Sequence, residues 1–244
     1  MAFTVIIPAR YASSRLPGKM LADIAGKPMI AHVVDRARES SASRVIVATD
    51  DQRIADALDG LDCEVCMTLA DHESGSDRIA EVVHKLAIGD DEIIVNIQGD
   101  EPLAPGVLID QVAAALDIAG DAVMSTAAKA INKQSDIDNP NVVKVVFSRA
   151  GKALYFSRAP IPYARDQRYT NAWHHIGIYA YRASFLKRYD QLVRSSIEQT
   201  ESLEQLRVLD NGDDIMVETI DYDTGIGVDT AEDLERARAL MSRS

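Results

Sequence analysis

The sequence predicts an α/β fold: a mostly parallel sheet with helices on both faces and a smaller mixed or antiparallel β-rich subregion. Three observations support this. Short apolar runs alternate with helix-length segments over the first 130 residues, the rhythm of βαβ units. Between residues 142 and 181, strand-like runs follow one another with few helices between them, which favours antiparallel pairing. The chain is 47% hydrophobic and 26% charged, as is usual for a globular protein.

In the first half, strands are predicted where β-branched and apolar residues cluster between polar turns. They cover residues 3–7, 44–49, 63–68, 92–97 and 122–126. Helices are predicted over 27–40, from 50 onward, over 77–87 and over 105–119. Pro28 falls in the first turn of its helix, where its missing N–H costs nothing, and Ser76 is expected to cap the helix that starts at 77. This alternation predicts a nucleotide-binding half over residues 1–130.

The second half changes pattern, although the whole chain is expected to form one domain, residues 1–244. Strands are predicted over 142–147, 153–158 and 176–181, helices between 184 and 210, a strand over 214–219 and a closing helix over 230–241. Residues 148–152 are typical of a hairpin turn. The β-rich subregion spans 131–185, and residues 186–244 complete the core. Between residues 148 and 170 the sequence contains a single acidic residue, Asp166. The same stretch contains five basic residues: Arg149, Lys152, Arg158, Arg165 and Arg168. This region is expected to face an acidic ligand or another subunit.

Charge and cysteine content exclude several classes of protein. The net charge of −12 argues against a nucleic-acid partner or an anionic membrane surface. No apolar run has the length of a spanning helix, and the first residues enter a strand directly, so a cytoplasmic location is expected. Cys63 and Cys66 lie within a predicted strand, where buried free thiols are favoured over a zinc site shared with His174 and His175.

A basic loop over residues 8–19 follows the first predicted strand. It contains Arg10, Arg15 and Lys19, and no acidic residue precedes Asp23. Ligands in α/β sheets bind at the carboxyl ends of strands, and small residues in the loop let backbone N–H groups approach an anion. The loop therefore predicts a polyphosphate site, with a solvated surface loop as the alternative.

The loop differs from two common phosphate-binding motifs. Gly18 and Lys19 are followed by Met20, and Ser13 occupies the earlier glycine position, so the loop is no Walker A motif. The GxGxxG fingerprint of dinucleotide-dependent oxidoreductases is also absent from the sequence.

Two aspartates are candidates for a magnesium site. Asp100 follows the predicted strand at 92–97, and Asp229 follows Gly225 and Gly227, which permit close backbone approach. Mg²⁺ typically takes one or two carboxylates, water and phosphate oxygens. Each aspartate alone could instead be a turn residue or a helix cap. Together with the basic loop they predict nucleotidyl transfer, in which a hydroxyl attacks the α-phosphorus of a nucleoside triphosphate and pyrophosphate leaves.

Six ordered segments resemble the motifs of the 3-deoxy-manno-octulosonate cytidylyltransferases, the CMP-Kdo synthetases. They are residues 9–19, 72–78, 98–102, 175–179, 203–207 and 227–230. The resemblance covers nearly the whole chain and implies a Rossmann-like fold of the nucleotide-diphospho-sugar transferase type. It implies transfer of CMP from CTP to the anomeric hydroxyl of Kdo with Mg²⁺, yielding CMP-Kdo and pyrophosphate for lipopolysaccharide biosynthesis. It also implies a cytoplasmic homodimer with the β-rich subregion near the subunit contact.

The resemblance also implies roles for individual residues. The nucleotide-binding residues would be Arg10, Ser13, Arg15, Lys19, Ser74 and Arg78. Lys19, Arg15 and Asp100 would be catalytic, and Asp100 and Asp229 would hold the metal. The sugar-binding residues would be Gln98, Arg158, His175, Tyr179, Glu204 and Gln205.

Physical arguments accompany some of these implied sugar contacts. Arg158 suits a sugar carboxylate. His175 and Tyr179 lie four apart on a predicted strand, hence on one face, although a structural histidine and a core tyrosine are the alternative. Glu204 and Gln205 would ordinarily belong to an exposed helix face.

Two rival functions remain open at this stage. The chain departs from the usual family pattern at Met20, Ser76, Ile226 and Ala231, which leaves room for a related acid sugar such as 8-amino Kdo or sialic acid. A non-catalytic nucleotide-binding protein on the same fold is the second alternative, and the presence of Asp100, Asp229 and Lys19 argues against it.

Overall fold

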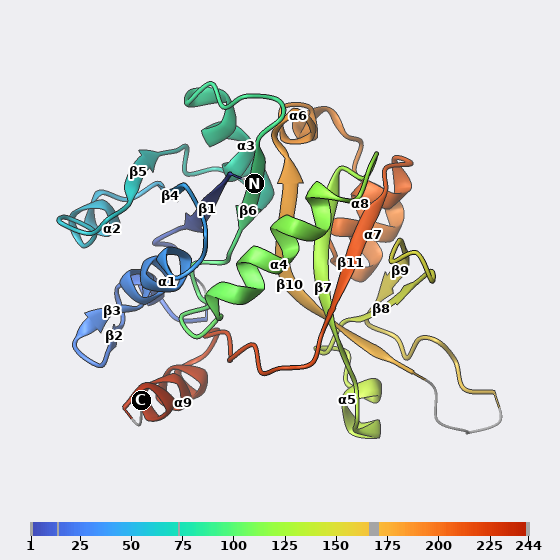
Figure 1. Ribbon diagram of the computed structural model, residues 1–244. Helices are drawn as coiled ribbons and strands as arrows, with labels where there is room; N and C mark the ends of the chain where they lie inside the picture. The colour runs from blue at the N-terminus through green and yellow to red at the C-terminus, as the bar shows by residue number, and fades with distance from the viewer. Residues whose placement is uncertain (1, 14, 73, 166–170, 243–244) are drawn as a thin grey trace.

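The computed structural model describes residues 2–13, 15–72, 74–165 and 171–242. Ser14 of the basic loop, Glu73 of the second motif, and Asp166 and Arg168 of the second basic region lie outside these ranges. Within them, one sheet of nine strands forms the centre of the molecule (Figure 1). Its main path runs in the order β11-β7-β10-β6-β1-β4-β5. The strands of this path are β1 (Phe3–Ala9), β4 (Arg44–Thr49), β5 (Glu64–Met67), β6 (Ile93–Asn96), β7 (Met124–Ala130), β10 (Trp173–Arg182) and β11 (Ile215–Ile220).

The pairing confirms the predicted mixture of parallel and antiparallel strands. β1 pairs in parallel with β4 and β6, β4 with β5, and β11 with β7. β10 runs antiparallel between β6 and β7. The hairpin of β8 (Lys144–Phe147) and β9 (Ala153–Ser157) joins β10 through β8, as the turn at 148–152 predicts. The short ribbon of β2 (Asp23–Ile24) and β3 (Lys27–Pro28) was not expected, because two-residue strands are too short to show a period.

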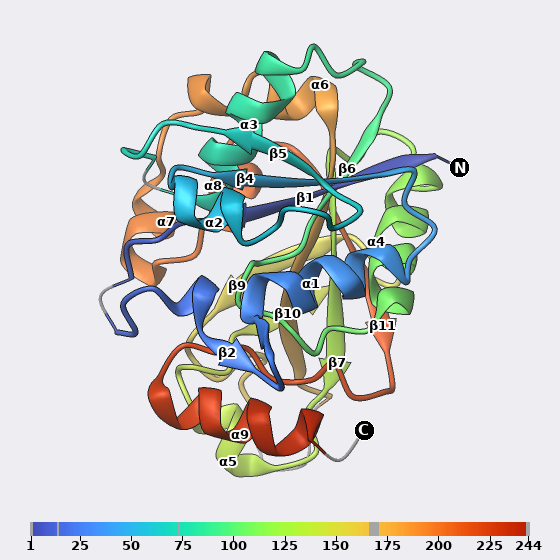
Figure 2. The same ribbon diagram turned by 90° about the vertical axis from the view of Figure 1, so that its left-hand side faces the viewer.

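Helices cover both faces of the sheet (Figure 2). They are α1 (Met29–Arg38), α2 (Gln52–Asp56), α3 (Gly75–Lys85), α4 (Gly106–Asp117), α5 (Gln134–Asp138), α6 (Ala183–Leu186), α7 (Ser196–Glu201), α8 (Gln205–Asp210) and α9 (Ala231–Met241), with 3₁₀ turns η1 (Lys19–Leu21) and η2 (Tyr189–Gln191). One apolar cluster contains buried residues of α1, α4 and α9, and a second contains buried residues of α3, α6 and α8.

The burial of the first strand explains its mostly apolar sequence. All seven residues of β1 are buried because helices cover both sides of the sheet. Ile7 belongs to the cluster with α1 and α4, whereas its neighbour Ile6 belongs to the cluster with α3, as the alternation of side chains along a strand requires. Burying one such side chain contributes roughly 1.5–3 kcal/mol to stability. Residues of β1 therefore stabilise both apolar clusters, one on each face of the sheet.

The expected start of α3 was wrong by two residues. Ser74 has extended backbone angles and its Oγ accepts a hydrogen bond from the Asp77 N–H, so Ser74 is the N-cap. Ser76 instead lies in the first helical turn and is buried. The Ser-x-Ser sequence offers two capping residues, and contacts with other elements decide which one is used.

The cysteines also differ from expectation, because β5 is the last strand of the main path. Cys63 and Cys66 are free thiols that are half-buried rather than buried, since β5 pairs with β4 and has no partner on its other side among the described strands. Partial burial still raises the pKa of both thiols.

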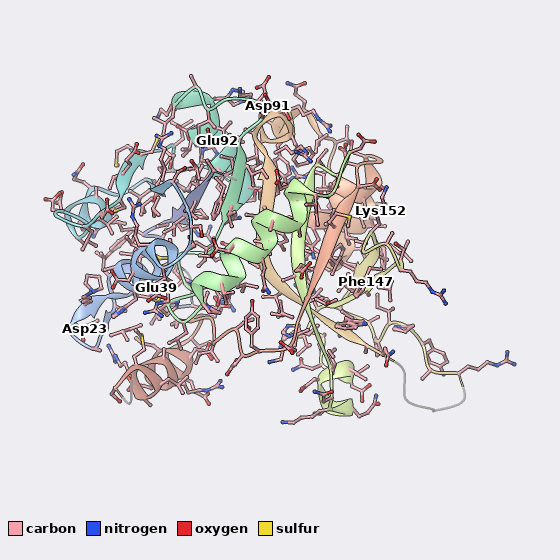
Figure 3. The ribbon with its side chains drawn as sticks, viewed as in Figure 1. Asp23, Glu39, Asp91, Glu92, Phe147 and Lys152 are labelled. Carbon is pink, nitrogen blue, oxygen red and sulfur yellow. The ribbon has the colours of Figure 1, made fainter. Side chains whose placement is uncertain are left out.

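The two ends of the parallel strands have different characters. At the amino-terminal end of β6, Glu92 (Figure 3) accepts a hydrogen bond from the Thr4 hydroxyl of β1. The opposite, carboxyl ends of β1 and β6 lead into the basic loop and into Gln98, Gly99 and Asp100. None of the helices in the described ranges combines the length and apolar character needed to span a bilayer.

Candidate active site

The basic loop has a fixed shape between β1 and η1. Gly18 adopts φ +69°, and its N–H donates to the Tyr11 carbonyl at 3.3 Å. The Arg53 guanidinium stacks over the Tyr11 ring, 3.4 Å from its centroid. A side chain at Gly18 would combine an unfavourable φ with a 3.3 Å contact to the Tyr11 hydroxyl. Lys19, the next residue, is therefore directed inward and is only 8% exposed.

Lys19 lies between two carboxylates from distant parts of the sequence. Its Nζ is 2.5 Å from Asp100 Oδ2 and 3.2 Å from Asp229 Oδ1. Arg15 Nη2 lies 2.9 Å from the same Asp229 oxygen. The two predicted metal ligands and two predicted catalytic cations thus form one ion-pair cluster at the carboxyl ends of β1 and β6.

Close backbone packing brings Asp229 to this position. The Val228 N–H donates to the Asp100 carbonyl at 2.8 Å. A Cβ on Gly225, which has φ +78°, would lie 2.5 Å from the Leu103 side chain, and one on Gly227 would lie 2.7 Å from Glu101 Oε1. At Gly225 the positive φ and the Leu103 backbone require glycine, whereas a side chain at Gly227 would displace the Glu101 carboxyl group. The loop before α9 can therefore reach the end of β6.

Asp229 is not needed to cap the helix that follows it. Thr230 is the N-cap of α9 and forms a capping box with Asp233, each side chain accepting from the other residue's backbone N–H. The alternative assignment of Asp229 as a helix cap is therefore wrong, and its carboxylate is available to the ion-pair cluster.

A third acid stands beside the cluster. Burial and the neighbouring Asp100 and Asp229 carboxylates raise the pKa of Glu101 to about 8. Among the described residues, no group of three or more His, Cys, Asp and Glu is arranged to hold a metal by itself. Two carboxylates at one point nevertheless match what Mg²⁺ takes from a protein when phosphate oxygens and water complete its shell.

A cavity of about 260 Å³ opens beside the cluster. All six residues predicted to bind the nucleotide line it, together with both aspartates and Gln98; they are Arg10, Ser13, Arg15, Lys19, Ser74 and Arg78. Arg78 is 3% exposed and is held by hydrogen bonds to the Thr68 hydroxyl and Asp50. The N-terminus of α3 at Ser74 and Gly75 also faces the cavity, which favours a bound anion.

Sequence reasoning missed one polar residue of this cavity. His72 lines it, and its Nε2 lies 2.5 Å from Glu81 Oε2. The pKa of Glu81 is lowered to about 2, because hydrogen bonds from His72, Leu69 and Lys85 outweigh its partial burial. His72 lies within one of the six motifs, which was the available signal, but the sequence analysis assigned a role only to Ser74 and Arg78 of that segment.

A second cavity of about 250 Å³ adjoins the first. Gln98 and Glu204 line both cavities. The second cavity is also lined by Tyr179, Gln205 and further residues of β10, η2 and α8. Gln205 is buried at the start of α8, whereas Glu204, just before the helix, stays exposed where the two cavities meet.

His175 and Tyr179 face the same side of β10, with ring centroids 5.5 Å apart. His175 Nε2 lies 3.0 Å from Thr126 Oγ1, and that hydroxyl donates to the Ile178 carbonyl at 2.8 Å. The hydroxyl's single proton is thereby used, so His175 donates from Nε2 and its Nδ1 accepts from Gln205 at 3.5 Å.

Burial holds this histidine neutral. Removal from water lowers the pKa of His175 to about 3, with His174 adding to the effect. Gln205 Oε1 in turn accepts from the Tyr179 hydroxyl at 3.5 Å, and burial raises the pKa of that hydroxyl far above its usual value. A buried, uncharged chain of hydrogen bonds therefore runs from Thr126 to Tyr179.

Two predicted sugar-binding residues, His175 and Arg158, line neither of these two cavities; His175 lines a third cavity of about 180 Å³, and Arg158 is held by main-chain oxygens. Arg158 Nε donates to the Glu201 carbonyl at 2.7 Å, its Nη1 to the Pro140 carbonyl at 3.0 Å and its Nη2 to the Ser202 carbonyl at 3.4 Å. These contacts join the end of β9 to α7, and the guanidinium is occupied by main-chain oxygens.

Comparison with known proteins agrees with this geometry. The sequence model of the cytidylyltransferase family matches residues 4–215. The chain is 55% identical to a 3-deoxy-manno-octulosonate cytidylyltransferase of Histophilus somni strain 129Pt, covering 99% of both chains. It is 54% identical to the protein of that name in Hahella chejuensis, covering 100% of this chain and 99% of the relative.

Two solved structures show the same fold. One is described as CMP:2-keto-3-deoxy-manno-octonic acid synthetase complexed with CTP; it superimposes with a TM-score of 0.92 at 45% identity, covering 99% of this chain and 98% of the other. A cytidylyltransferase from Leptospira borgpetersenii superimposes with a TM-score of 0.63 at 17% identity, covering 100% of this chain and 87% of the other, and it supports the fold alone. The chain therefore belongs to the cytidylyltransferase family and, within it, to the 3-deoxy-manno-octulosonate cytidylyltransferases.

Proposed function

We propose that this protein transfers CMP from CTP to the anomeric hydroxyl of Kdo, giving CMP-Kdo and pyrophosphate. The observation that carries the proposal is the Lys19 cluster. One ammonium group is shared by Asp100 and Asp229 beside a cation-lined cavity, and a second polar cavity adjoins it through Gln98 and Glu204. A nucleotide cavity and an acceptor cavity that meet at paired carboxylates suit a transfer between two bound substrates.

In the proposed reaction, the acceptor oxygen forms a bond to the α-phosphorus of CTP while the bond to the pyrophosphate oxygen breaks. Arg10, Ser13 and Arg15 would hold the phosphate oxygens, with Arg15 and Lys19 neutralising charge on the departing pyrophosphate. The amino-terminal end of α3, capped by Ser74, would contribute backbone N–H groups. These groups act by position and charge. The proton of the attacking hydroxyl would pass to solvent water once a bound metal had lowered its pKa, so a dedicated proton-accepting histidine is not required.

Asp100 and Asp229 are proposed to hold Mg²⁺. The fit rests on their shared approach to Lys19, which marks a point of concentrated negative charge. When bound, the metal would neutralise phosphate charge and lower the pKa of the attacking hydroxyl. Lys19 would then turn from the carboxylates toward the phosphates, exchanging one set of anionic partners for another.

The acceptor cavity offers neutral donors and acceptors with one carboxyl group. Gln98, Tyr179 and Gln205 would contact sugar hydroxyls, and Glu204 would accept from one of them. His175 would not contact the sugar, but would orient Gln205 through the hydrogen bond to its Nδ1. Arg158 belongs to the proposal as a partner for the sugar carboxylate, but it would first have to release the main-chain oxygens that now hold it.

We further propose that the protein is a cytoplasmic homodimer that supplies lipopolysaccharide biosynthesis. Exposed apolar side chains of the β-rich subregion, Leu154 at 63% and Tyr163 at 84%, support a subunit contact there. The division into a CTP-binding half (1–130), a sugar-binding and dimerisation subregion (131–185) and a completing segment (186–244) is part of the same proposal.

Pyrophosphate release provides the direct test. The protein is incubated with CTP, Mg²⁺ and one acid sugar at a time: Kdo, 8-amino Kdo or sialic acid. We expect release with Kdo to exceed that with the other two. Pyrophosphate release only with sialic acid or only with 8-amino Kdo would replace Kdo as the proposed acceptor. CTP binding without pyrophosphate release in the presence of any of the sugars would identify a non-catalytic nucleotide-binding protein.

A further inference from the structure

Ser76 is a buried hydroxyl that joins three elements. It lies in the first turn of α3 and is 4% exposed. Its Oγ donates to Glu204 Oε2 at 3.1 Å and lies 3.3 Å from the Tyr181 hydroxyl of β10. Ser74 already caps the helix, so the Ser76 hydroxyl is free to connect α3 with the start of α8 and with β10.

Glu204 stands in the wall between the nucleotide cavity and the acceptor cavity and lines both. It is positioned just before α8, and its side chain does not cap that helix. Among the described residues, Ser76 is the hydrogen-bond donor that reaches its carboxyl group. A glutamate side chain has several rotatable bonds, so this bond selects one of many possible orientations.

We propose that Ser76 is a positioning residue for the acceptor sugar, whose hydroxyl holds Glu204 so that the other carboxylate oxygen faces a sugar hydroxyl. The inference rests on the proposed function, because it assigns the cavity beside Glu204 to the acceptor. Ser76 itself need not touch either substrate. Because α3 begins at the nucleotide cavity, the same hydroxyl also fixes the distance between the phosphate-binding end of α3 and the acceptor wall.

The charge state of Glu204 depends on the same contact. The residue is exposed at the mouth of the cavities, but desolvation of its carboxyl group by the surrounding side chains raises the pKa of Glu204, and the Ser76 hydrogen bond opposes that rise. Charged groups nearby act in both directions: Asp77 of α3 and Glu198 of α7 raise the pKa, whereas Arg207 of α8 lowers it. Hydroxyl groups of β10 and η2 face the same region, from Tyr179, Tyr181 and Tyr189. Loss of the Ser76 hydroxyl should therefore move ionisation of Glu204 to higher pH.

Three variants test the proposal: Ser76→Ala removes the hydroxyl, Ser76→Thr keeps it, and Ser125→Ala is the matched control. Ser125 is equally buried, and its hydroxyl donates to the Val112 carbonyl at 2.6 Å, away from both cavities. The KM for Kdo is measured at saturating CTP, and the Kd for CTP is measured by calorimetry without Kdo. The acid side of the pH profile of kcat/KM for Kdo is recorded for each variant.

For Ser76→Ala we expect the KM for Kdo to rise about 10-fold, the loss of roughly one hydrogen bond to a charged group. Its Kd for CTP should stay within about twofold, and the acid limb should move to higher pH because the carboxylate loses a stabilising donor. Ser76→Thr should keep the wild-type KM for Kdo and the wild-type position of the acid limb in the pH profile of kcat/KM. Ser125→Ala should show wild-type kinetics, with at most a lower melting temperature.

Different failures have different meanings. If the wild-type protein releases pyrophosphate with none of the acid sugars, the proposed function and this inference fall together. If the wild type turns over Kdo and Ser76→Ala keeps its KM and acid limb, only the inference is overturned. Equal losses for Kdo and CTP, or a loss in Ser76→Thr as large as in Ser76→Ala at unchanged melting temperature, would also overturn it.

Discussion

The two adjoining cavities, which we propose bind the nucleotide and the acceptor, differ in the groups around them. On the nucleotide side, some of the charged groups remain partly in water: the Arg15 side chain is 64% exposed and that of Asp229 is 47% exposed, whereas Lys19 and Arg78 are buried. On the acceptor side, His175 is 6% exposed and Gln205 is 4% exposed, and both are neutral members of a hydrogen-bonded chain. A highly charged metal–triphosphate complex calls for exchangeable countercharges, whereas a sugar calls for fixed donors and acceptors.

The difference also indicates what each region does before substrate arrives. The ion pairs among Lys19, Asp100 and Asp229 satisfy groups that are proposed to hold metal and phosphate later, so these contacts must exchange during the reaction. The chain from Thr126 to Tyr179 has no such exchange to make and can stay rigid. Substitutions should therefore affect turnover most on the nucleotide side and acceptor affinity or stability on the other side.

Asp100→Asn should produce the largest effect. An amide is a much poorer Mg²⁺ ligand than a carboxylate, so kcat should fall about 10³-fold or more. The fold should survive, because Lys19 keeps Asp229 as a partner. Pyrophosphate release and a melting curve are measured on the same preparation. Near-normal turnover would exclude Asp100 from the mechanism and contradict the proposed Mg²⁺ site at Asp100 and Asp229.

Lys19→Ala should follow, with a fall in kcat of about 10²-fold. The free energy of unfolding should drop by only about 1 kcal/mol, because Asp229 is exposed enough for water to replace its ion pair. With the ammonium gone, added Mg²⁺ should raise the melting temperature of the variant more than that of the wild type. A large loss of stability with little change in kcat would instead mark the basic loop as structural.

His175→Gln tests whether His175 is uncharged in the folded protein, through the pH dependence of the free energy of unfolding. The folded pKa of about 3 lies below the unfolded value near 6.5, so between these values the unfolded state binds more protons. Stability therefore falls as pH falls, by about 2 kcal/mol at pH 5 relative to pH 8. Glutamine removes this contribution, so chemical denaturation at the two pH values should give a flatter dependence. An equally steep dependence would show that His175 is protonated in the folded protein.

Arg44→Ala supplies the baseline for charge pairs outside the cavities. Arg44 makes two contacts of 2.9 Å with Glu64 at the surface, joining β4 to β5. An exposed pair of this kind contributes less than about 1 kcal/mol, and high salt should reduce the difference between variant and wild type. Its kcat and both KM values should match the wild type. A loss of activity here would mean that charge effects are not confined to the nucleotide side.

Local pattern in the sequence determined the elements and the place of the proposed phosphate site. The second long strand was predicted at 44–49 and found at Arg44–Thr49, because its apolar run is bounded by polar residues. The basic loop was located from its charges and from its position after the first strand. The meeting of Asp100 with Asp229 was expected from their positions at strand ends and loops and from the family resemblance.

Only the tertiary structure decided how these residues are used. The choice of Ser74 over Ser76 as the cap of α3, and the hydrogen-bond partner of Glu204, depend on a contact across 128 residues of sequence. Lys19 reaches Asp229 across 210 residues. Such contacts leave no periodic signal in the chain. Side-chain partners, desolvation and hydrogen-bond direction are set by tertiary packing: of α3, α8 and β10 for Ser76, and of the loop before α9 against the end of β6 for Lys19.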